Sequence, residues 1–235
     1  MGRIFEKRKH KMFARWAKMA KGFTKMGKEI AIAVKQNGPD PDSNPRLRTA
    51  IQNAKGINMP KDRIDAAIKR ASEKGTGNFE ELTYEGYGPY GVAILVECAT
   101  DNPTRTVANI RMYFSRNEGA LGTKGSLDFI FGRKGIFRLK AEGVNREELE
   151  LDLIDFGAEE ITEEDNELVI YTPFGDFGKM QKALEEGKAN IISAEKLRIP
   201  NSYVEVSEEQ EAVLDKIIEQ IEEDDDVQAV YHNMK

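Results

Sequence analysis

One stretch decides the fold: residues 135–200 read GIFRLKAEGVNREELELDLIDFGAEEITEEDNELVIYTPFGDFGKMQKALEEGKANIISAEKLRIP. Short β-branched and apolar runs alternate here with two longer segments whose apolar residues recur at helical spacing. The pattern predicts a strand at 135–140, a helix at 146–156, strands at 159–162 and 168–171, a helix at 177–186 and a strand at 192–199. This β-α-β-β-α-β order is that of a ferredoxin-like sandwich.

The sequence on either side of this stretch has the same kind of alternation. Before it we expect a strand at 92–98, a helix at 105–117 and a strand at 127–131. After it we expect a strand at 203–206, a helix at 208–223 and a strand at 227–231. Residues 79–132 and 201–235 can therefore form a second α+β sandwich, into which residues 133–200 are inserted.

The first part of the chain has only helical patterns. An amphipathic helix is expected over 11–34, a second from Pro45 to Gly56 and a third from Pro60 to Gly75, because proline opens and glycine ends each of the last two. A Gly/Thr/Asn linker follows at 75–78. The predicted fold class is thus α+β, with three domains: 1–75, 79–132 with 201–235, and 133–200.

Charge divides the chain at the same linker. The net charge is -6, yet residues 1–74 hold 19 Lys and Arg against 7 Asp and Glu, whereas residues 75–235 hold 16 against 34. A first third of +12 joined to a remainder of -18 indicates that the first third meets a polyanion, since such basic density is the usual mark of nucleic-acid binding. The alternative is attraction between the two parts of one molecule.

We predict that the cations of the first third contact nucleic acid. On the expected helix over 11–34 several of them lie opposite the apolar face formed by Phe13, Trp16 and Phe23, and we expect this cationic face to be exposed to water. The predicted nucleic-acid-binding residues are Lys7, Arg8, Lys9, Lys11, Arg15, Lys18, Lys21, Lys25, Lys28, Arg46, Arg48, Lys55, Lys61, Arg63, Lys69 and Arg70.

The sequence contains few candidate catalytic or metal-binding residues. His10 and His232 are the two histidines, and neither has the neighbours of a zinc motif. Cys98 lies in an apolar strand, where a cysteine packs as a small hydrophobe. We therefore expect no enzyme activity, no catalytic residue, no metal and no cofactor. A hydrolase built on acidic loops is kept as a remote alternative.

Two glycine-rich stretches and two acidic runs need their own interpretation. Glu85–Gly91 fits neither nucleotide fingerprint and is interpreted as a turn into the sheet, with its tyrosines packed locally rather than stacked on bases. Gly119–Ser126 could hold a phosphate through backbone amides but is more simply a flexible connection. The acidic runs at 159–165 and 222–226 are interpreted as solvated turns, because like charges normally face water.

Several motifs resemble the YebC/PmpR family of transcriptional regulatory proteins over nearly the whole chain. They are Phe23-Thr24-Lys25, Lys28-Glu29-Ile30, GPDPDSNPRLR at 38–48, Ala54-Lys55, NMPKD at 58–62, AIKRA at 67–71, YEGYGP at 84–89, Asp101-Asn102, Arg105-Thr106, Gly122 and DDDVQAVYHN at 224–233. The start departs from the family, whose members often begin with a Gly-His-Ser-Lys-Trp-Ala-like stretch. Here MGRIFE stands at 1–6, and a related Arg15-Trp16-Ala17 comes later.

The resemblance implies a helical N-terminal domain and two α+β domains, one inserted in the other. It also implies a regulator of gene expression, since members are described as DNA-binding transcriptional regulators, as a mitochondrial translational activator, and as ribosome-associated factors that relieve stalling. The expected partner is therefore DNA or ribosomal RNA, with the ribosome as a further candidate; a protein-binding adaptor is the alternative.

The sequence also bears on the location of the protein. No apolar run approaches the ~18 residues of a membrane span. With one cysteine and no secretory signal we expect a cytoplasmic protein, a mitochondrial presequence being the less favoured interpretation of the basic start. The sequence leaves the oligomeric state open.

Overall fold

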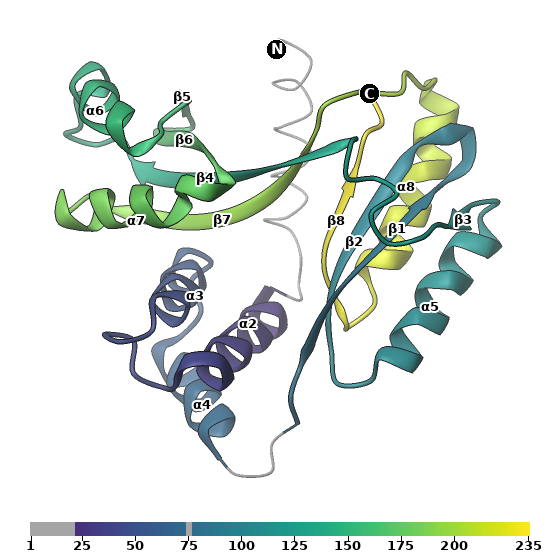
Figure 1. Cartoon of the computed structure of the whole chain (residues 1–235), viewed down its shortest axis with the longest axis horizontal. Coiled ribbons are helices and arrows are strands. Elements are labelled where there is room, and N and C mark those ends of the chain that lie inside the picture. The colour runs from purple at the N-terminus through teal and green to yellow at the C-terminus, as the bar shows by residue number, and fades with distance from the viewer. Residues whose placement is uncertain (1–21, 74–76) are drawn as a thin grey trace. The chain divides into compact units, whose positions relative to one another are not determined.

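A computed structural model describes residues 22–73 and 77–235, and these residues belong to two compact units (Figure 1). Of the described residues, unit 1 comprises 22–32, 77–132 and Pro200–Lys235, and unit 2 comprises Ala33–Glu73 and Arg133–Ile199. Helix α2 (Gly22–Asn37) begins in unit 1 and ends in unit 2.

Unit 1 contains a four-stranded sheet with one face covered by two helices. Its strands are β1 (Glu80–Tyr87), β2 (Ala93–Thr100), β3 (Ala120–Leu121) and β8 (Val227–His232), in the order β3-β1-β2-β8. The helices are α5 (Pro103–Arg116) and α8 (Glu208–Glu222). Alternate residues of β2 meet apolar residues of both helices in one buried core, as the period of two along a strand requires.

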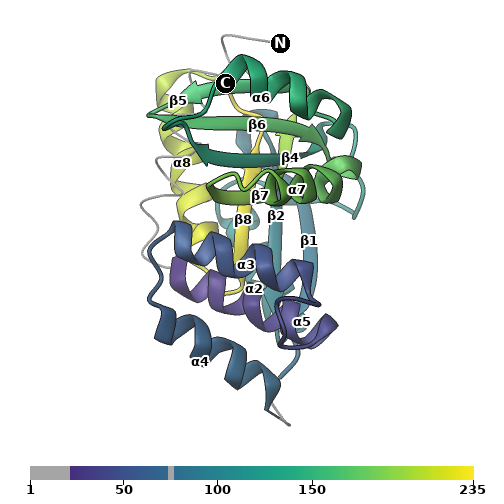
Figure 2. The ribbon, with the colours of Figure 1, turned by 90° about the vertical axis from the view of Figure 1, so that its left-hand side faces the viewer.

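Unit 2 contains the second sheet and two of the N-terminal helices (Figure 2). Its elements run β4 (Phe131–Lys140), α6 (Arg146–Leu153), β5 (Glu160–Glu164), β6 (Glu167–Pro173), α7 (Phe177–Glu186) and β7 (Ile191–Pro200). The strand order β5-β6-β4-β7 is that of a ferredoxin-like sandwich, as the opening stretch of sequence predicts. Short 3-10 turns, η2 (Ile154–Phe156) and η3 (Phe174–Asp176), adjoin α6 and α7.

Helix α3 (Pro45–Gly56) lies against β7, and α4 (Lys61–Ser72) packs beside α3. The Asn53 side-chain amide donates to the backbone oxygen of Ala194 and accepts from its N–H, both at 2.8 Å, so it pairs with this residue of β7 as a strand's backbone would. The approach is close at Gly56, where an added Cβ would lie 2.4 Å from the carbonyl oxygen of Ile192. Only glycine therefore fits at the end of α3.

The α+β class is confirmed, with an N-terminal helical region and two four-stranded sheets. The strand expected at 127–131 is wrong: residues 124–130 form turns, and the third strand of unit 1 is the short β3. Strand β1 includes residues 85–87, which belong to the Glu85–Gly91 stretch interpreted from the sequence as a turn. At 203–206 a single bridge joins Val204 to Met234. Unit 1 therefore runs β-β-α-β-α-β, with the β1–β2 hairpin in the centre of its sheet. The division into three domains stays a prediction.

None of the helices formed by residues 22–73 and 77–235 is long and apolar enough to cross a membrane.

Candidate nucleic-acid interface

The predicted nucleic-acid-binding residues fall into three groups. Seven of them lie outside the described residues: Lys7, Arg8, Lys9, Lys11, Arg15, Lys18 and Lys21. Four are engaged in contacts within their own units: Lys25, Lys28, Arg46 and Arg48. Five are exposed to solvent: Lys55, Lys61, Arg63, Lys69 and Arg70.

Lys25 is buried against β8, and Lys28 is half-buried against β2 and the turn before β8. Lys25 Nζ donates to the backbone oxygen of Gln228 at 2.9 Å, and its residue is 8% exposed. Lys28 Nζ donates to Ala99 O at 3.0 Å, to Asp225 O at 2.7 Å and to Asp226 Oδ1 at 3.0 Å. The expectation that these two lysines lie on a wet face is therefore wrong, because three acceptors surround the Lys28 ammonium group.

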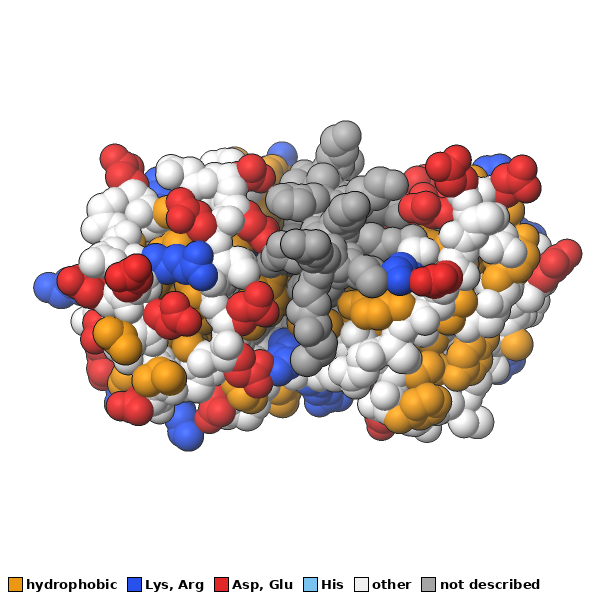
Figure 3. All heavy atoms as spheres, turned by 90° about the horizontal axis from the view of Figure 1, so that it is seen from above, with side chains coloured by type: hydrophobic (Ala, Val, Ile, Leu, Met, Phe, Trp, Pro, Cys, Tyr) orange, Lys and Arg blue, Asp and Glu red, His pale blue; other side chains and the backbone are white. Residues whose placement is uncertain are grey.

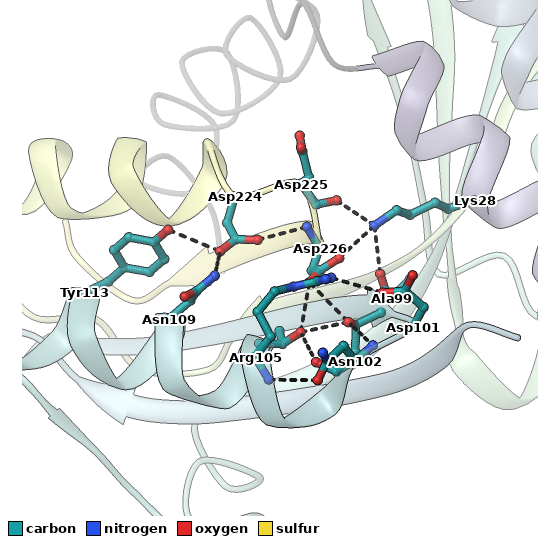
Figure 4. Close-up of polar contacts among 12 residues, drawn as sticks. Lys28, Ala99, Asp101, Asn102, Arg105, Asn109, Tyr113, Asp224, Asp225 and Asp226 are labelled. Carbon is teal, nitrogen blue, oxygen red and sulfur yellow. Dashed lines mark hydrogen bonds and ion pairs between the residues drawn. The ribbon is translucent and has the colours of Figure 1, made fainter. Parts of the chain in front are cut away.

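Asp226 is the centre of this contact (Figure 4). Its Oδ2 accepts hydrogen bonds from Arg105 Nη2 at 2.7 Å, from Thr106 Oγ1 at 2.9 Å and from Thr100 Oγ1 at 3.1 Å. Burial alone would raise the pKa of Asp226, but hydrogen bonds from Arg105, Lys28 and Thr106 lower that pKa to about 2. The carboxylate is thus ionised and fully surrounded by donors.

Asp224 extends the same network toward α5. Its Oδ2 accepts from Asn109 Nδ2 at 2.9 Å and from the Tyr113 hydroxyl at 3.1 Å, while its Oδ1 accepts from the backbone N–H of Asp226 at 2.9 Å. Burial, together with the Asp224 carboxylate, raises the pKa of Tyr113 to about 12. The interpretation of 222–226 as a solvated turn is therefore wrong, since Asp226 and Glu222 are buried and Asp224 is half-buried. Asp101-Asn102, Arg105-Thr106 and the DDD run at 224–226 are all among the family motifs quoted above. That shared membership is the sequence signal that could have pointed to this network.

Arg46 and Arg48 form contacts within unit 2, to which both belong. Arg48 Nη1 donates to Pro41 O at 2.8 Å and to Asp42 O at 3.1 Å, and its Nε lies 3.6 Å from the Glu185 carboxylate. Arg46 Nη1 donates to Gln36 Oε1 at 3.0 Å. Both guanidinium groups thus help to fix the loop at 38–44 and the start of α3.

The exposed cations are concentrated on α4 and at the end of α3. Helix α4 buries Ile64 and Ala71, and its Lys and Arg side chains lie in solvent. Lys69 and Arg70 are in the last turn, where cations interact favourably with the helix dipole, and Asp62 is in the first turn. This α4 patch is defined as Lys55, Lys61, Arg63, Lys69 and Arg70. On the face seen in Figure 3, Asp and Glu side chains are spread over both units, with scattered Lys and Arg between them.

The Gly119–Ser126 segment holds a carboxylate of its own chain. Glu85 is 4% exposed, and its carboxylate accepts from the backbone N–H groups of Gly125 at 2.8 Å and Leu127 at 2.7 Å. The Ser126 hydroxyl lies 3.4 Å away. The segment is therefore structured rather than a flexible connection, and its anion-binding amides are already used. The same bonds explain why residues 127–130 form turns rather than a strand, since the Glu85 side chain takes the amide of Leu127.

Cys98 and the tyrosines at 84–90 are further candidate residues that the structure describes. Among residues 22–73 and 77–235 no group of His, Cys, Asp and Glu could hold a metal ion. Cys98 is 3% exposed, and burial, with the nearby Asp224 carboxylate, raises the pKa of its thiol to about 12. Tyr84 packs locally, as expected, whereas Tyr87 and Tyr90 are 37% and 49% exposed.

Comparisons with known proteins agree with the fold and identify the family. The family described as "TACO1/YebC protein N-terminal domain" matches residues 3–74, and "TACO1/YebC second and third domain" matches 79–234. A "probable transcriptional regulatory protein" of Cytophaga hutchinsonii is 58% identical over all of this chain and 98% of its own length. One of Parabacteroides distasonis is 55% identical over all of this chain and 97% of its own. The crystal structure of a conserved hypothetical protein from Aquifex aeolicus is similar with a TM-score of 0.78 and 38% identity, covering 93% of this chain and 92% of that one. The chain belongs to the TACO1/YebC family.

Proposed function

We propose that this protein is a nucleic-acid-binding regulator of gene expression that grips phosphates with the α4 patch and with the basic residues that precede Gly22. The observation that supports this most is the patch itself, whose five cationic residues are exposed to solvent, whereas Lys25 is buried and Lys28 is half-buried. The names of the curated relatives favour a regulatory role.

The chemistry of the patch favours phosphate contact over base recognition. Lysine is a point charge that suits phosphates, whereas bidentate recognition of guanine is best made by arginine. Arg46, Arg48 and Arg63 are the arginines of this region that could read guanine. Arg46 and Arg48 are held by Gln36, Pro41, Asp42 and Glu185, which leaves Arg63 as the exposed candidate on α4. We therefore propose structured RNA or the ribosome, rather than a defined DNA operator, as the working target of a non-enzymatic cytoplasmic protein.

A competition experiment at physiological salt tests this choice. The full-length protein is bound to labelled RNA, and ribosomes, random duplex DNA and a duplex selected for binding compete for it. We expect ribosomes to compete far better than either duplex. If the selected duplex wins by ~10³ or more over random DNA, as specific DNA binders do, while ribosomes compete no better than random DNA, the target is an operator and the proposal is wrong.

A protein-binding adaptor is the second candidate, and the surface of α6 favours it. Leu151 and Ile154 are 72% and 61% exposed, one helical turn apart, and exposed carboxylates such as Glu147 and Glu150 lie around them. An adaptor working through this surface should retain its partner after nuclease treatment and should bind it with little dependence on salt. Pull-down of the Leu151→Lys variant, with and without nuclease, separates the two candidates.

A further inference from the structure

An exposed aromatic ring in unit 2 lies close to two cations. Phe174 is in η3, after β6 and before α7, and it is 39% exposed. The guanidinium carbon of Arg133 on β4 is 5.2 Å from its ring centroid, and Lys196 Nζ on the neighbouring strand β7 is 5.3 Å from it. Both cations are exposed.

The residues next to Phe174 in the chain include a second, well-packed aromatic ring, Phe177. Phe177, three residues later, stacks on Phe137 with centroids 4.7 Å apart and an interplanar angle of 28°. Gly135 makes room for it, because an added Cβ there would lie 2.7 Å from both Phe177 Cδ2 and Thr172 Cγ2. Lys196 Nζ is also 4.9 Å from the Phe177 centroid. Phe177, one turn after Phe174, is thus firmly packed, and Lys196 lies near both rings.

The charges around the ring leave a net positive surface. Asp176 is paired with Lys179 at 3.1 Å, and Glu159 is paired with Lys134. Among the residues that the structure describes, neither Arg133 nor Lys196 forms an ion pair. The Asp176 and Glu159 carboxylates are therefore paired with other lysines, and the charges of Arg133 and Lys196 are available to a ligand.

We propose that Phe174, Arg133 and Lys196 form a binding site for a single-stranded segment of nucleic acid, with one base stacked on Phe174 and the adjoining phosphates on the two cations. Proteins that hold single strands combine these parts, because every base has a face that can stack and every linkage carries a charge. A guanidinium group beside a ring adds cation–π attraction. The site rests on the proposed nucleic-acid function and adds a contact with bases to the phosphate contacts of the α4 patch.

The test measures affinity of the full-length protein for oligouridine and for an abasic strand with the same backbone. Phe174→Leu removes the aromatic face but keeps an apolar side chain, and we expect it to weaken binding of oligouridine by roughly 5- to 150-fold, the worth of one stacked base. Binding of the abasic strand should not change. Phe174→Tyr should restore the affinity for oligouridine, and Arg133→Gln with Lys196→Gln should weaken both strands.

Matched controls separate this site from the wider proposal. Phe129→Leu removes another exposed ring, and Lys182→Gln removes an exposed cation on α7; neither should change the affinity. If the wild type binds oligouridine and Phe174→Leu binds it as Phe129→Leu does, the site is refuted while the proposed function stands. If Phe174→Leu loses the abasic strand equally, the ring has no stacking role. If the wild type binds neither single strands, duplexes nor ribosomes, the proposed function itself fails.

Discussion

Lys28 Nζ donates a hydrogen bond of 3.0 Å to Asp226 Oδ1, so that a residue of α2 is joined to the turn before β8. The Lys28 side chain is 13% exposed and that of Asp226 is 6% exposed. Because water is largely excluded, this ion pair is sensitive to loss of either partner in a way that surface pairs are not.

Replacing Lys28 by glutamine should therefore destabilise the protein by roughly 1.5–3 kcal/mol, the usual worth of a hydrogen bond to a charged group. The free energy of unfolding, measured by denaturant titration, checks this. Lys55→Gln is the matched control, because Lys55 is exposed on α3 and should leave stability unchanged. Equal stability of the two variants would show that the Lys28–Asp226 contact contributes nothing.

The Asp226 network should also make stability depend on pH in acid. The folded state lowers the pKa of Asp226 from 3.8 to about 2, so the carboxylate contributes stability that is complete above the unfolded value and is lost as pH falls through the folded one. This loss should occur between about pH 4 and pH 2 and amount to roughly 2 kcal/mol. The difference in unfolding free energy between the wild type and Asp226→Asn should shrink over that interval. A constant difference from pH 5 to pH 2 contradicts the network.

Glu85→Gln should destabilise unit 1. The carboxylate accepts from two backbone N–H groups through different oxygens, whereas an amide offers one acceptor oxygen and would set an NH2 group against one of those donors. We expect a loss of roughly 1–3 kcal/mol, seen as a lower Tm. Glu118→Gln, at an exposed position, serves as the control. An unchanged Tm for Glu85→Gln would mean that the 124–130 turns do not depend on this side chain.

Cys98 should be inert in the native protein. Its thiol is buried, and a pKa of about 12 leaves almost no thiolate at neutral pH, which is the reactive form. A thiol reagent at pH 8 should label Cys98 only as fast as the protein unfolds, and rapidly in denaturant. Labelling of the native protein at the rate of a free thiol would contradict this burial.

Local sequence pattern was sufficient for unit 2 and for most helices. The apolar runs that form β4, β6 and β7 and the helical spacing of α6 and α7 are properties of neighbouring residues, and the predicted order of elements is the observed one. Asn44 and Pro45 likewise start α3, with Asn44 accepting from Leu47 N at 3.1 Å.

Long-range contacts account for what the sequence left out. A helical projection places Lys25 and Lys28 on a polar face, but it cannot show that Asp226, 198 residues away, lies opposite Lys28. The turn at 124–130 is fixed by Glu85, about 40 residues earlier. Helix α3 is hydrogen-bonded to β7 through Asn53 and Ala194, which are 141 residues apart. The first 75 residues alone would therefore lack the strand against which α3 packs.

The salt dependence of nucleic-acid binding by an α4 variant tests the central claim most directly. The variant changes Lys61, Arg63, Lys69 and Arg70 to glutamine in the full-length chain. Its matched control changes four other exposed residues, two lysines and two arginines: Lys182, Lys188, Arg111 and Arg116. Each lost phosphate contact should reduce the slope of log affinity against log salt by about 0.9 on duplex or about 0.7 on single strands. We predict a clearly shallower slope and weaker binding for the α4 variant, with the control close to the wild type. An unchanged slope for the α4 variant, or an equal change in the control, would contradict the assignment of the α4 patch as a nucleic-acid interface.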